Sequence, residues 1–431
     1  MNLNNIIHPI STARKAKASL AVHLRIWKFG NHGRKRFRGD PRYDLQNVSR
    51  GFASSSEEAS DDTLLLERIC AAYNASVACQ TTGSHVYTTV EALDRLRQGP
   101  LRPSIRALIE NDTATLAKAY RNFYRDPCSS GLLAAPNGMP SAYFNGSIKD
   151  IYRHFYLSHV LYRLDYWKEI TDGRFSLKDL AGPKAGNPFG VTIDGTHIAV
   201  GSEYAHYCSD RVASLMNRPE GHRTSVAQIG GGFGAIAYFL LRDHQPLTYF
   251  NFDAPERVAL STYYLMKAFP HLTFLLYGEK PLTPDTLSQP DVVLLPAFAL
   301  AAMPNASVDI AFSSNGLANV SPGAVDDTLR SIMVMTRRSL LYIGNDVFAE
   351  SIPERLSKEQ CPFVRTDKRT SGWHSHKVSG AGVRDAAGVA VSALLEQTFI
   401  RNSAAESPID HAPVSSRKNE VLATSSTKEA S

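Results

Sequence analysis

Three glycines at alternate positions form the part of this sequence best suited to hold a ligand. Gly230, Gly232 and Gly234 follow a short apolar run and precede a stretch of helical character. Glycine lets a backbone turn sharply and approach a ligand, and the N-terminus of the next helix presents free N–H groups. Asp253 closes the following apolar run, where its carboxylate can accept hydrogen bonds from ribose hydroxyls. This order of strand, glycine turn, helix, strand and acid is typical of a nucleotide-binding unit.

The glycine spacing alone fits two kinds of cofactor. It satisfies the G-x-G-x-x-A pattern of dinucleotide sites, and also the alternating glycines of S-adenosylmethionine (SAM) sites. The stretch from Asp309 to Asn315 favours SAM, because an acidic start and an apolar strand lead there to small and amide residues. Gln228 stands where SAM enzymes usually carry Glu or Asp. An amide can still form hydrogen bonds, but it brings no charge to the site.

Further candidates lie on a helix predicted to begin at residues 202–203. Tyr207 and Arg211 are expected to close over the carboxylate of the cofactor's methionine part, since Arg binds carboxylates through two hydrogen bonds. A plain amphipathic helix remains the alternative for both residues. His206 is the first candidate for a general base. The sequence shows no three metal ligands at convincing spacing, so no metal is expected.

The elements that must position these residues alternate between strands and helices. From residue 226 onward, apolar runs predict strands at 226–229, 248–252, 273–277, 308–313 and 339–343. Helical stretches separate most of them, which predicts an α/β fold with a Rossmann-like, doubly wound and mostly parallel sheet. Asp194-Gly195 predicts the turn of a β-hairpin upstream of the sheet.

Composition shifts divide the chain into five segments. They are a basic, flexible arm (1–58), a helical N-terminal cap domain (59–181), a lid-like hairpin and helix (182–224), the nucleotide-binding domain (225–400) and a disordered tail (401–431). The net charge of +6 is concentrated in the arm, because residues 1–50 hold eleven Lys and Arg against two acids. The remaining chain is therefore slightly acidic, and no nucleic-acid partner is expected.

The basic segment predicts contacts of its own. The charge of this segment has three interpretations. It can be a mobile tail, it can dock on a membrane surface or an acidic partner, or it can be an organellar transit peptide. The sequence contains no apolar run of the roughly 18 residues that span a membrane and no signal-peptide core near Met1. Its five cysteines are scattered without a C-x-x-C pair. A reducing, cytoplasmic location is expected.

The motif region also resembles a known family. AQIGGGFGAIAYFLL, followed by YFNFDAPERVALSTYYLMKAFP, is similar to the sugar O-methyltransferase family of bacterial SAM-dependent enzymes. The turn from Asp253 to Glu256 carries the more specific part of the match, and the similarity extends over roughly residues 60–345. The resemblance implies a class I methyltransferase fold, SAM as cofactor and a hydroxyl of a sugar or glycan-like small molecule as acceptor. An NAD(P)-dependent oxidoreductase and a catalytically degenerate binding module remain the alternatives.

Overall fold

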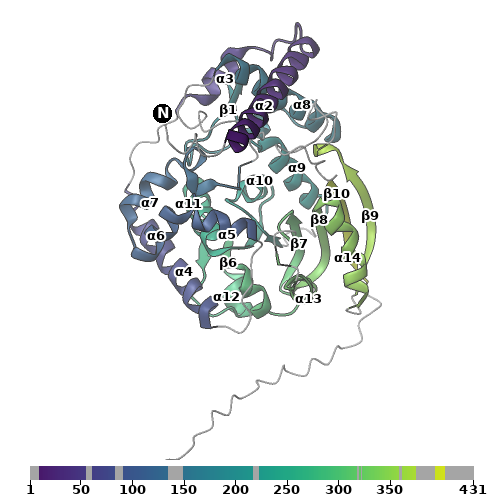
Figure 1. Ribbon diagram of the computed structural model, residues 1–431. Coiled ribbons are helices and arrows are strands. Elements are labelled where there is room, and N and C mark those ends of the chain that lie inside the picture. Colours follow the sequence, from purple (N-terminus) through teal and green to yellow (C-terminus); the bar gives the residue numbers. More distant parts are fainter. Residues whose placement is uncertain are drawn as a thin grey trace, which may run out of the picture.

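Eight strands form one sheet at the centre of the chain, in the order β5-β6-β4-β3-β7-β8-β10-β9 (Figure 1). The computed structural model describes residues 9–54, 61–82, 91–133, 149–216, 223–317, 320–321, 323–358, 362–374 and 394–402. The strands are β3 (Thr224–Ile229), β4 (Leu247–Asp253), β5 (Phe274–Leu276), β6 (Val292–Pro296), β7 (Val308–Ser314), β8 (Thr336–Asn345), β9 (Phe363–Ser371) and β10 (Leu394–Arg401). Of the expected C-terminal tail, residues 403–431 lie outside the described residues.

The order of the strands confirms the predicted fold class. Strand β3 pairs in parallel with β4 on one side and with β7 on the other, so the chain reverses its direction of travel across the sheet at β3. β10 is inserted between β8 and β9 and runs antiparallel to both. The fold is therefore a Rossmann-like sheet of the class I methyltransferase type. In such sheets ligands bind outside the carboxyl ends of the strands, where the order reverses.

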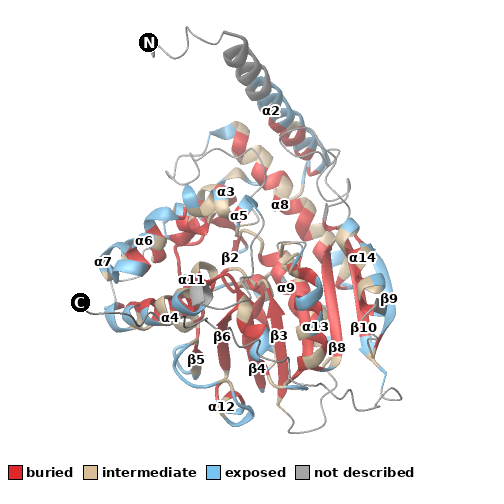
Figure 2. Cartoon of the chain, turned by 60° about the horizontal axis from the view of Figure 1, so that its bottom comes forward, coloured by how far each residue is buried: buried red, intermediate tan, exposed pale blue. Residues whose placement is uncertain are grey.

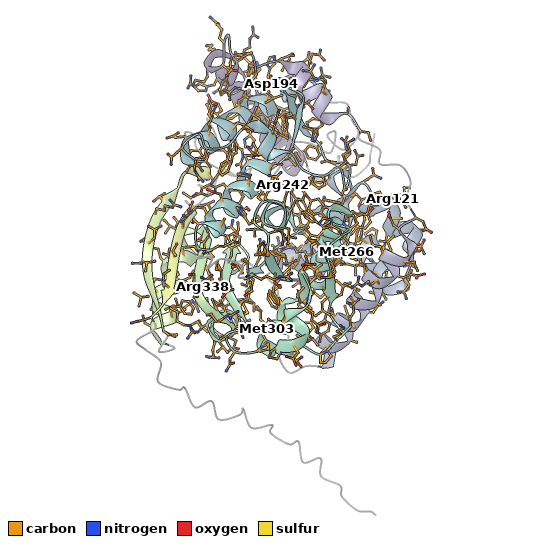
Figure 3. All side chains as sticks on the ribbon, turned by 180° about the vertical axis from the view of Figure 1, so that it is seen from behind. Arg121, Asp194, Arg242, Met266, Met303 and Arg338 are labelled. Atoms are coloured by element: carbon orange, nitrogen blue, oxygen red, sulfur yellow. The ribbon has the colours of Figure 1, made fainter. Side chains whose placement is uncertain are left out.

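Helices cover both faces of the sheet. On one face lie α9 (Ser202–Ala213), α10 (Ala235–Asp243) and α11 (Pro255–Ala268), and on the other lie α12 (Pro284–Ser288), η5 (Ala297–Ala302), α13 (Val325–Met335) and α14 (Asp346–Lys358). Neighbouring residues of β3 point to opposite faces, so Val226 joins the first core and Ala227 the second. The central strands are accordingly buried on both sides, whereas the edge strand β9 is exposed over residues 364–370 (Figure 2), and side chains fill both layers (Figure 3).

A group of helices before the sheet forms the expected cap. Its elements are α4 (Thr63–Thr82), α5 (Glu91–Gln98), α6 (Arg102–Glu110), α7 (Thr113–Tyr120), η1 (Phe123–Arg125) and η2 (Pro127–Ser129). The buried carboxylate of Asp62 joins this cap to α11, because it accepts hydrogen bonds from Tyr263 and Lys267, both at 3.1 Å. Arg121 of the cap binds the same carboxylate at 2.9 Å. These contacts hold the cap against α11, on one face of the sheet.

Within the segment expected to be a flexible arm, the described residues 9–54 are mostly helical. α2 (Pro9–Arg36) packs along α8 (Asp150–Ile170), and α3 (Leu45–Phe52) packs against the hairpin (Figure 1). Ile26, Phe29 and Phe37 are buried between these elements. The charge pattern was misleading because basic residues such as Lys28 and Lys35 are exposed, while Ile26 and Phe29 on the other side of α2 are buried. None of the described helices is both long and apolar enough to cross a membrane.

The hairpin before the sheet is confirmed. β1 (Gly190–Ile193) pairs with β2 (Thr196–Ala199), and Asp194 and Gly195 take the positive φ values of 48° and 77° that a tight hairpin turn requires. The hairpin packs on α3, where the Nε2 atom of His197 lies 3.2 Å from the carbonyl oxygen of Gly51. η4 (Leu177–Leu180) and α9 flank it, and η7 (Gly372–His374) follows β9. α9 is part of the layer on the sheet, which differs from the expected lid.

Candidate functional site

Side chains of β4 hold the glycine turn that follows β3. Alternate residues of a strand share one face, and two of them reach the neighbouring strand or its turn. The hydroxyl of Tyr249 donates to Oε1 of Gln228 at 2.8 Å. Oδ1 of Asn251 accepts from the backbone N–H of Gly231 at 3.2 Å, while its amide nitrogen donates to Ser261 at 3.0 Å. Gln228 is therefore a buried structural residue of the loop's base, and its amide is matched to a tyrosine hydroxyl.

Asp253 is the third side chain of this row and the one nearest to the open edge. Its Oδ2 accepts from the backbone N–H of Gly232 at 2.8 Å, and its Oδ1 from that of Ala254 at 2.7 Å. Arg257 lies 3.6 Å away as a counter-charge. Burial raises the pKa of this carboxyl above its ordinary value. An ionised carboxylate has about four acceptor positions, so two remain for ligand hydroxyls.

The four glycines of the turn differ in what surrounds them. A Cβ atom on Gly230 would lie 2.4 Å from Cα of Gly316, and one on Gly231 would lie 2.2 Å from Oδ1 of Asn251. At Gly234 the nearest atom would be a carbon of Leu265 at 3.1 Å. Among the residues that the structure describes, only Leu132 of the cap, at 3.6 Å, would come within 4 Å of a Cβ on Gly232. Gly232 thus turns an open side towards the cap, whereas the other three glycines are needed for packing.

The end of β7 meets the glycine turn at the point where the strand order reverses. Gly316 packs directly on Gly230, since a Cβ atom on Gly230 would lie only 2.4 Å from the Cα atom of Gly316. The preceding residue, Asn315, adopts a left-handed φ of 60° and accepts a hydrogen bond from the backbone N–H of Asn345 at 3.2 Å. The structure therefore brings Asn315 to the same edge as Gly230, Gly232 and Asp253. These are the predicted residues that it brings together.

An aromatic cluster fixes the turn to the cap. Phe233 contacts two cap residues, Phe123 and Tyr124, with ring centroids 5.2 and 5.4 Å away. Tyr264 of α11 also lies 5.2 Å from Phe233. Aromatic pairs at such distances add to the free energy of apolar burial. Sequence reasoning missed this role, although a Phe between two glycines of a ligand loop was a visible signal.

His206 is not at this edge. Its ring lies among Phe175, Phe239 and Trp167, with centroid distances of 4.6, 5.3 and 5.5 Å. The indole N–H of Trp167 donates to Nδ1 at 3.3 Å. Burial lowers the pKa of His206 from 6.5 to about 4, so the ring is neutral at pH 7. The expectation of a general base is wrong here, because the helix turns this side chain into the core.

Tyr207 and Arg211 bind a carboxylate that belongs to the protein itself. The hydroxyl of Tyr207 donates to both oxygens of Glu396 in β10, at 2.6 and 2.8 Å. Arg211 reaches the same carboxylate at 3.3 Å, and Arg369 of β9 at 2.9 Å. Glu396 is only 2% exposed. The predicted cofactor clamp is thus corrected to a structural network that joins α9 to the last two strands.

The carboxyl end of β8 contributes an acid that sequence reasoning missed. Asp346 directly follows Asn345, whose backbone is bound to Asn315. Oδ1 of Asp346 accepts from the N–H of Val347 at 2.8 Å, and the side chain is half-buried. The sequence could have indicated Asp346 by its position. It follows the apolar run Leu340–Ile343, as Asp253 ends the apolar strand β4. Across the described ranges, no three His, Cys, Asp or Glu side chains gather as a metal site.

A cavity of about 370 Å³ lies between the cap and the start of α11. Tyr73, Arg97 and Arg102 line its cap side, and Pro255 and Glu256 line the other. Arg97 and Glu256 are joined by an ion pair of 2.7 Å. The cavity thus adjoins the turn from Asp253 to Glu256 that follows β4.

Comparisons with known proteins give little beyond these observations. No protein-family model and no curated protein matches the sequence. A magnesium protoporphyrin IX methyltransferase (ChlM) from Synechocystis PCC 6803, solved with bound SAM, is 12% identical over 46% of this chain and 80% of its own, with a TM-score of 0.31. The mitomycin 7-O-methyltransferase MmcR is 14% identical over 47% of this chain and 55% of its own, with a TM-score of 0.28.

A third similar structure is the M. jannaschii protein TYW2 in complex with AdoMet. It is 13% identical over 46% of this chain and 76% of its own, with a TM-score of 0.28. TM-scores this low carry no argument about the present chain. The fold class therefore rests on the strand order described above.

Proposed function

We propose that this protein is a SAM-dependent methyltransferase that binds its cofactor between the glycine turn and Asp253. The observation that carries the proposal is the arrangement of Gly232 and Asp253. The open side of Gly232 provides room for a ligand, and its N–H orients the carboxylate of Asp253 beside that room. A carboxylate so placed suits the two hydroxyls of a ribose. The N-terminus of α10 adds a partial positive charge at the same edge.

The sheet favours a single nucleoside over a dinucleotide. Dinucleotide folds are built from two halves of three parallel strands each. Here β3, β4 and β6 make the first half, but β7 and β8 are followed by the antiparallel β10. The second half therefore lacks its third parallel strand. This supports SAM over NAD(P) as the ligand of the glycine turn.

The acceptor that we propose is a hydroxyl of a sugar or glycan-like molecule. Support for it comes from the sequence resemblance around Asp253–Glu256. SAM supplies the activated methyl group when it is bound, so the chain's own task is to align the reactants and exclude water. We assign Asp346 as the base that accepts the hydroxyl proton, since a carboxylate at the end of β8 lies at the edge where the acceptor would enter. Asn315 would position the acceptor or the cofactor beside it.

Titration calorimetry with SAM, S-adenosylhomocysteine, NAD and NADP tests the cofactor. We expect binding of the first two ligands only, and a loss of at least about tenfold in affinity for Asp253→Ala, as for a lost charge-assisted hydrogen bond. Asp243→Ala is the matched control, because this exposed carboxylate on α10 pairs with Arg242 away from the turn. Binding of NAD without SAM would make the protein an oxidoreductase candidate. Binding of none of the four would favour a degenerate fold.

A second measurement separates the base from the cofactor site. Asp346→Asn should lower the turnover rate about 100-fold while the Kd of SAM is unchanged, because general-base catalysis contributes factors of this size. A screen of sugar and glycan acceptors with isotope-labelled methyl groups supplies the readout. Equal turnover of Asp346→Asn and the wild type would remove Asp346 from the mechanism. Methylation of a nitrogen or carbon atom instead of a hydroxyl would overturn the proposed acceptor.

A further inference from the structure

Helix α2 has two faces with different surroundings. At 3.6 residues per turn, the buried positions Ile26, Phe29, Gly30 and Gly33 share one side of the helix. A second row lies on the opposite, outward side. It consists of Leu20, Leu24 and Trp27, which are 61%, 49% and 53% exposed. Three large apolar side chains at positions i, i+4 and i+7 therefore form a continuous strip in solvent.

The inner face fastens α2 to the body. A Cβ atom on Gly33 would lie 1.9 Å from Oγ of Ser158, so the two helices approach closely at this glycine. The hydroxyls of Tyr152 and Tyr162 lie 3.0 and 2.8 Å from ring nitrogens of His23 and His32. The described turns of α2 lie at the periphery of the molecule with exposed residues along them (Figure 2). The outward strip is thus presented by a fixed helix.

Positive charge surrounds the strip. Lys28, Arg34 and Lys35 are exposed and fall on the same side as Leu24 and Trp27. No ion pair involves these three residues within the part of the chain that the structure describes. The sequence contains no Asp or Glu before Asp40. The outward face of α2 therefore combines exposed apolar side chains with cationic side chains that form no ion pair among the described residues.

We propose that this outward face of α2 docks on the surface of a bilayer that contains anionic lipids. Tryptophan and leucine can enter the boundary between headgroups and acyl chains, while lysine and arginine extend their charges to lipid phosphates. A second copy of the chain is disfavoured as occupant, because two such faces would bring like charges together. An acidic protein would satisfy the cations but gives no specific role to the exposed Trp27 and leucines.

Vesicle sedimentation tests this proposal on the full-length chain. The probes are vesicles of phosphatidylcholine alone and of an equal mixture with phosphatidylserine. We expect binding to the mixed vesicles only, with an affinity that falls as salt is added. The double variants Leu20→Ser/Leu24→Ser and Lys28→Glu/Lys35→Glu should each weaken this binding at least about tenfold, because each removes one of the two contributions. All variants should keep the melting temperature of the wild type, since the changed residues are exposed.

Matched controls and a spectroscopic readout complete the experiment. Leu64→Ser and Lys280→Glu change an exposed leucine and an exposed lysine elsewhere, and should bind as the wild type does. Trp167 and Trp373 are buried, so a blue shift of fluorescence on adding vesicles reports Trp27, and Trp27→Phe should abolish it. Sedimentation unchanged by either double variant, or a wild type that ignores mixed vesicles, overturns the proposal. Self-association that only the leucine variant abolishes, without vesicle binding, would identify a second copy as the occupant.

Discussion

The side-chain oxygen of Asn251 accepts a hydrogen bond from the backbone N–H of Gly231 at 3.2 Å. Asn251 lies inside strand β4, whereas Gly231 lies in the turn that follows the neighbouring strand. The turn is therefore held from the side by a buried residue, before any ligand is bound. Such preorganisation reduces the ordering that binding requires.

Asn251→Ala should accordingly weaken SAM binding about tenfold, because Gly231 loses its partner and the turn becomes mobile. The variant should also lose about 1–2 kcal/mol of unfolding free energy. Calorimetry and urea unfolding measure the two effects. Ser261→Ala is the control, since it removes the other hydrogen bond of Asn251 and leaves Gly231 bound. A control that weakens SAM binding as much as Asn251→Ala would show that the effect comes from general loosening.

The raised pKa of Asp253 predicts opposite pH effects on binding and stability. Ligand affinity should rise as pH increases from the ordinary carboxyl value of 3.8 through the raised pKa, because the ionised form accepts ribose hydroxyls more strongly. Over the same interval the folded state binds this proton more tightly than the unfolded state, so ionisation of Asp253 costs stability. Asp253→Asn should remove both dependences. A pH series of SAM titrations and urea unfolding, with wild type and variant compared, would falsify this assignment if the two proteins behaved alike.

The Glu396 network predicts a loss of stability without a loss of ligand binding. Glu396→Gln leaves Arg211 and Arg369 facing a neutral amide, and about 3 kcal/mol of unfolding free energy should be lost. Folded variant protein should bind SAM with the affinity of the wild type. Glu350→Gln, which breaks an exposed pair with Lys368, should change stability by about 0.5 kcal/mol or less. A strong loss of SAM affinity in Arg211→Ala would restore the cofactor clamp expected from the sequence.

His206 predicts an acid-sensitive core. Its pKa is lowered from 6.5 to about 4, so the unfolded state binds the proton more readily between these values. The contribution of neutral His206 to the free energy of unfolding is fully present above pH 6.5. It is lost as the pH falls towards 4, by up to about 3 kcal/mol. His206→Phe should therefore lose less stability on acidification than the wild type. Urea unfolding at several pH values gives the comparison, and parallel curves for both proteins would contradict it.

The sequence was most informative where the signals are local. The hairpin at Asp194-Gly195, the alternating strands and helices, and the glycine turn with Asp253 all follow from neighbouring residues. Tyr207 and Arg211 were misassigned because their partner, Glu396, lies 189 residues from Tyr207 and reaches it only when β10 enters the sheet. No local pattern discloses such a pairing.

Burial explains the remaining differences. His206 was a candidate because its helix was expected to be a lid over the ligand, yet its ring packs against Trp167 and Phe239. The N-terminal segment was interpreted as a solvated tail because of its many basic residues. Its few buried apolar residues, such as Ile26 and Phe29, nevertheless hold it against the body. Glycines at positions 30 and 33 were the signal of a close helix contact, but only a partner helix gives them that meaning.

The position of β10 has a consequence for how the chain matures during synthesis. Because β10 is the last strand of the described sheet and lies between β8 and β9, translation must pass residue 401 before either neighbour is paired with it. Until then the edge of β8 is an unpaired row of backbone groups, and the nascent chain exposes it to other polypeptides. A ribosome-bound chain therefore carries the glycine turn and Asp253 beside a sheet that still lacks a strand between β8 and β9.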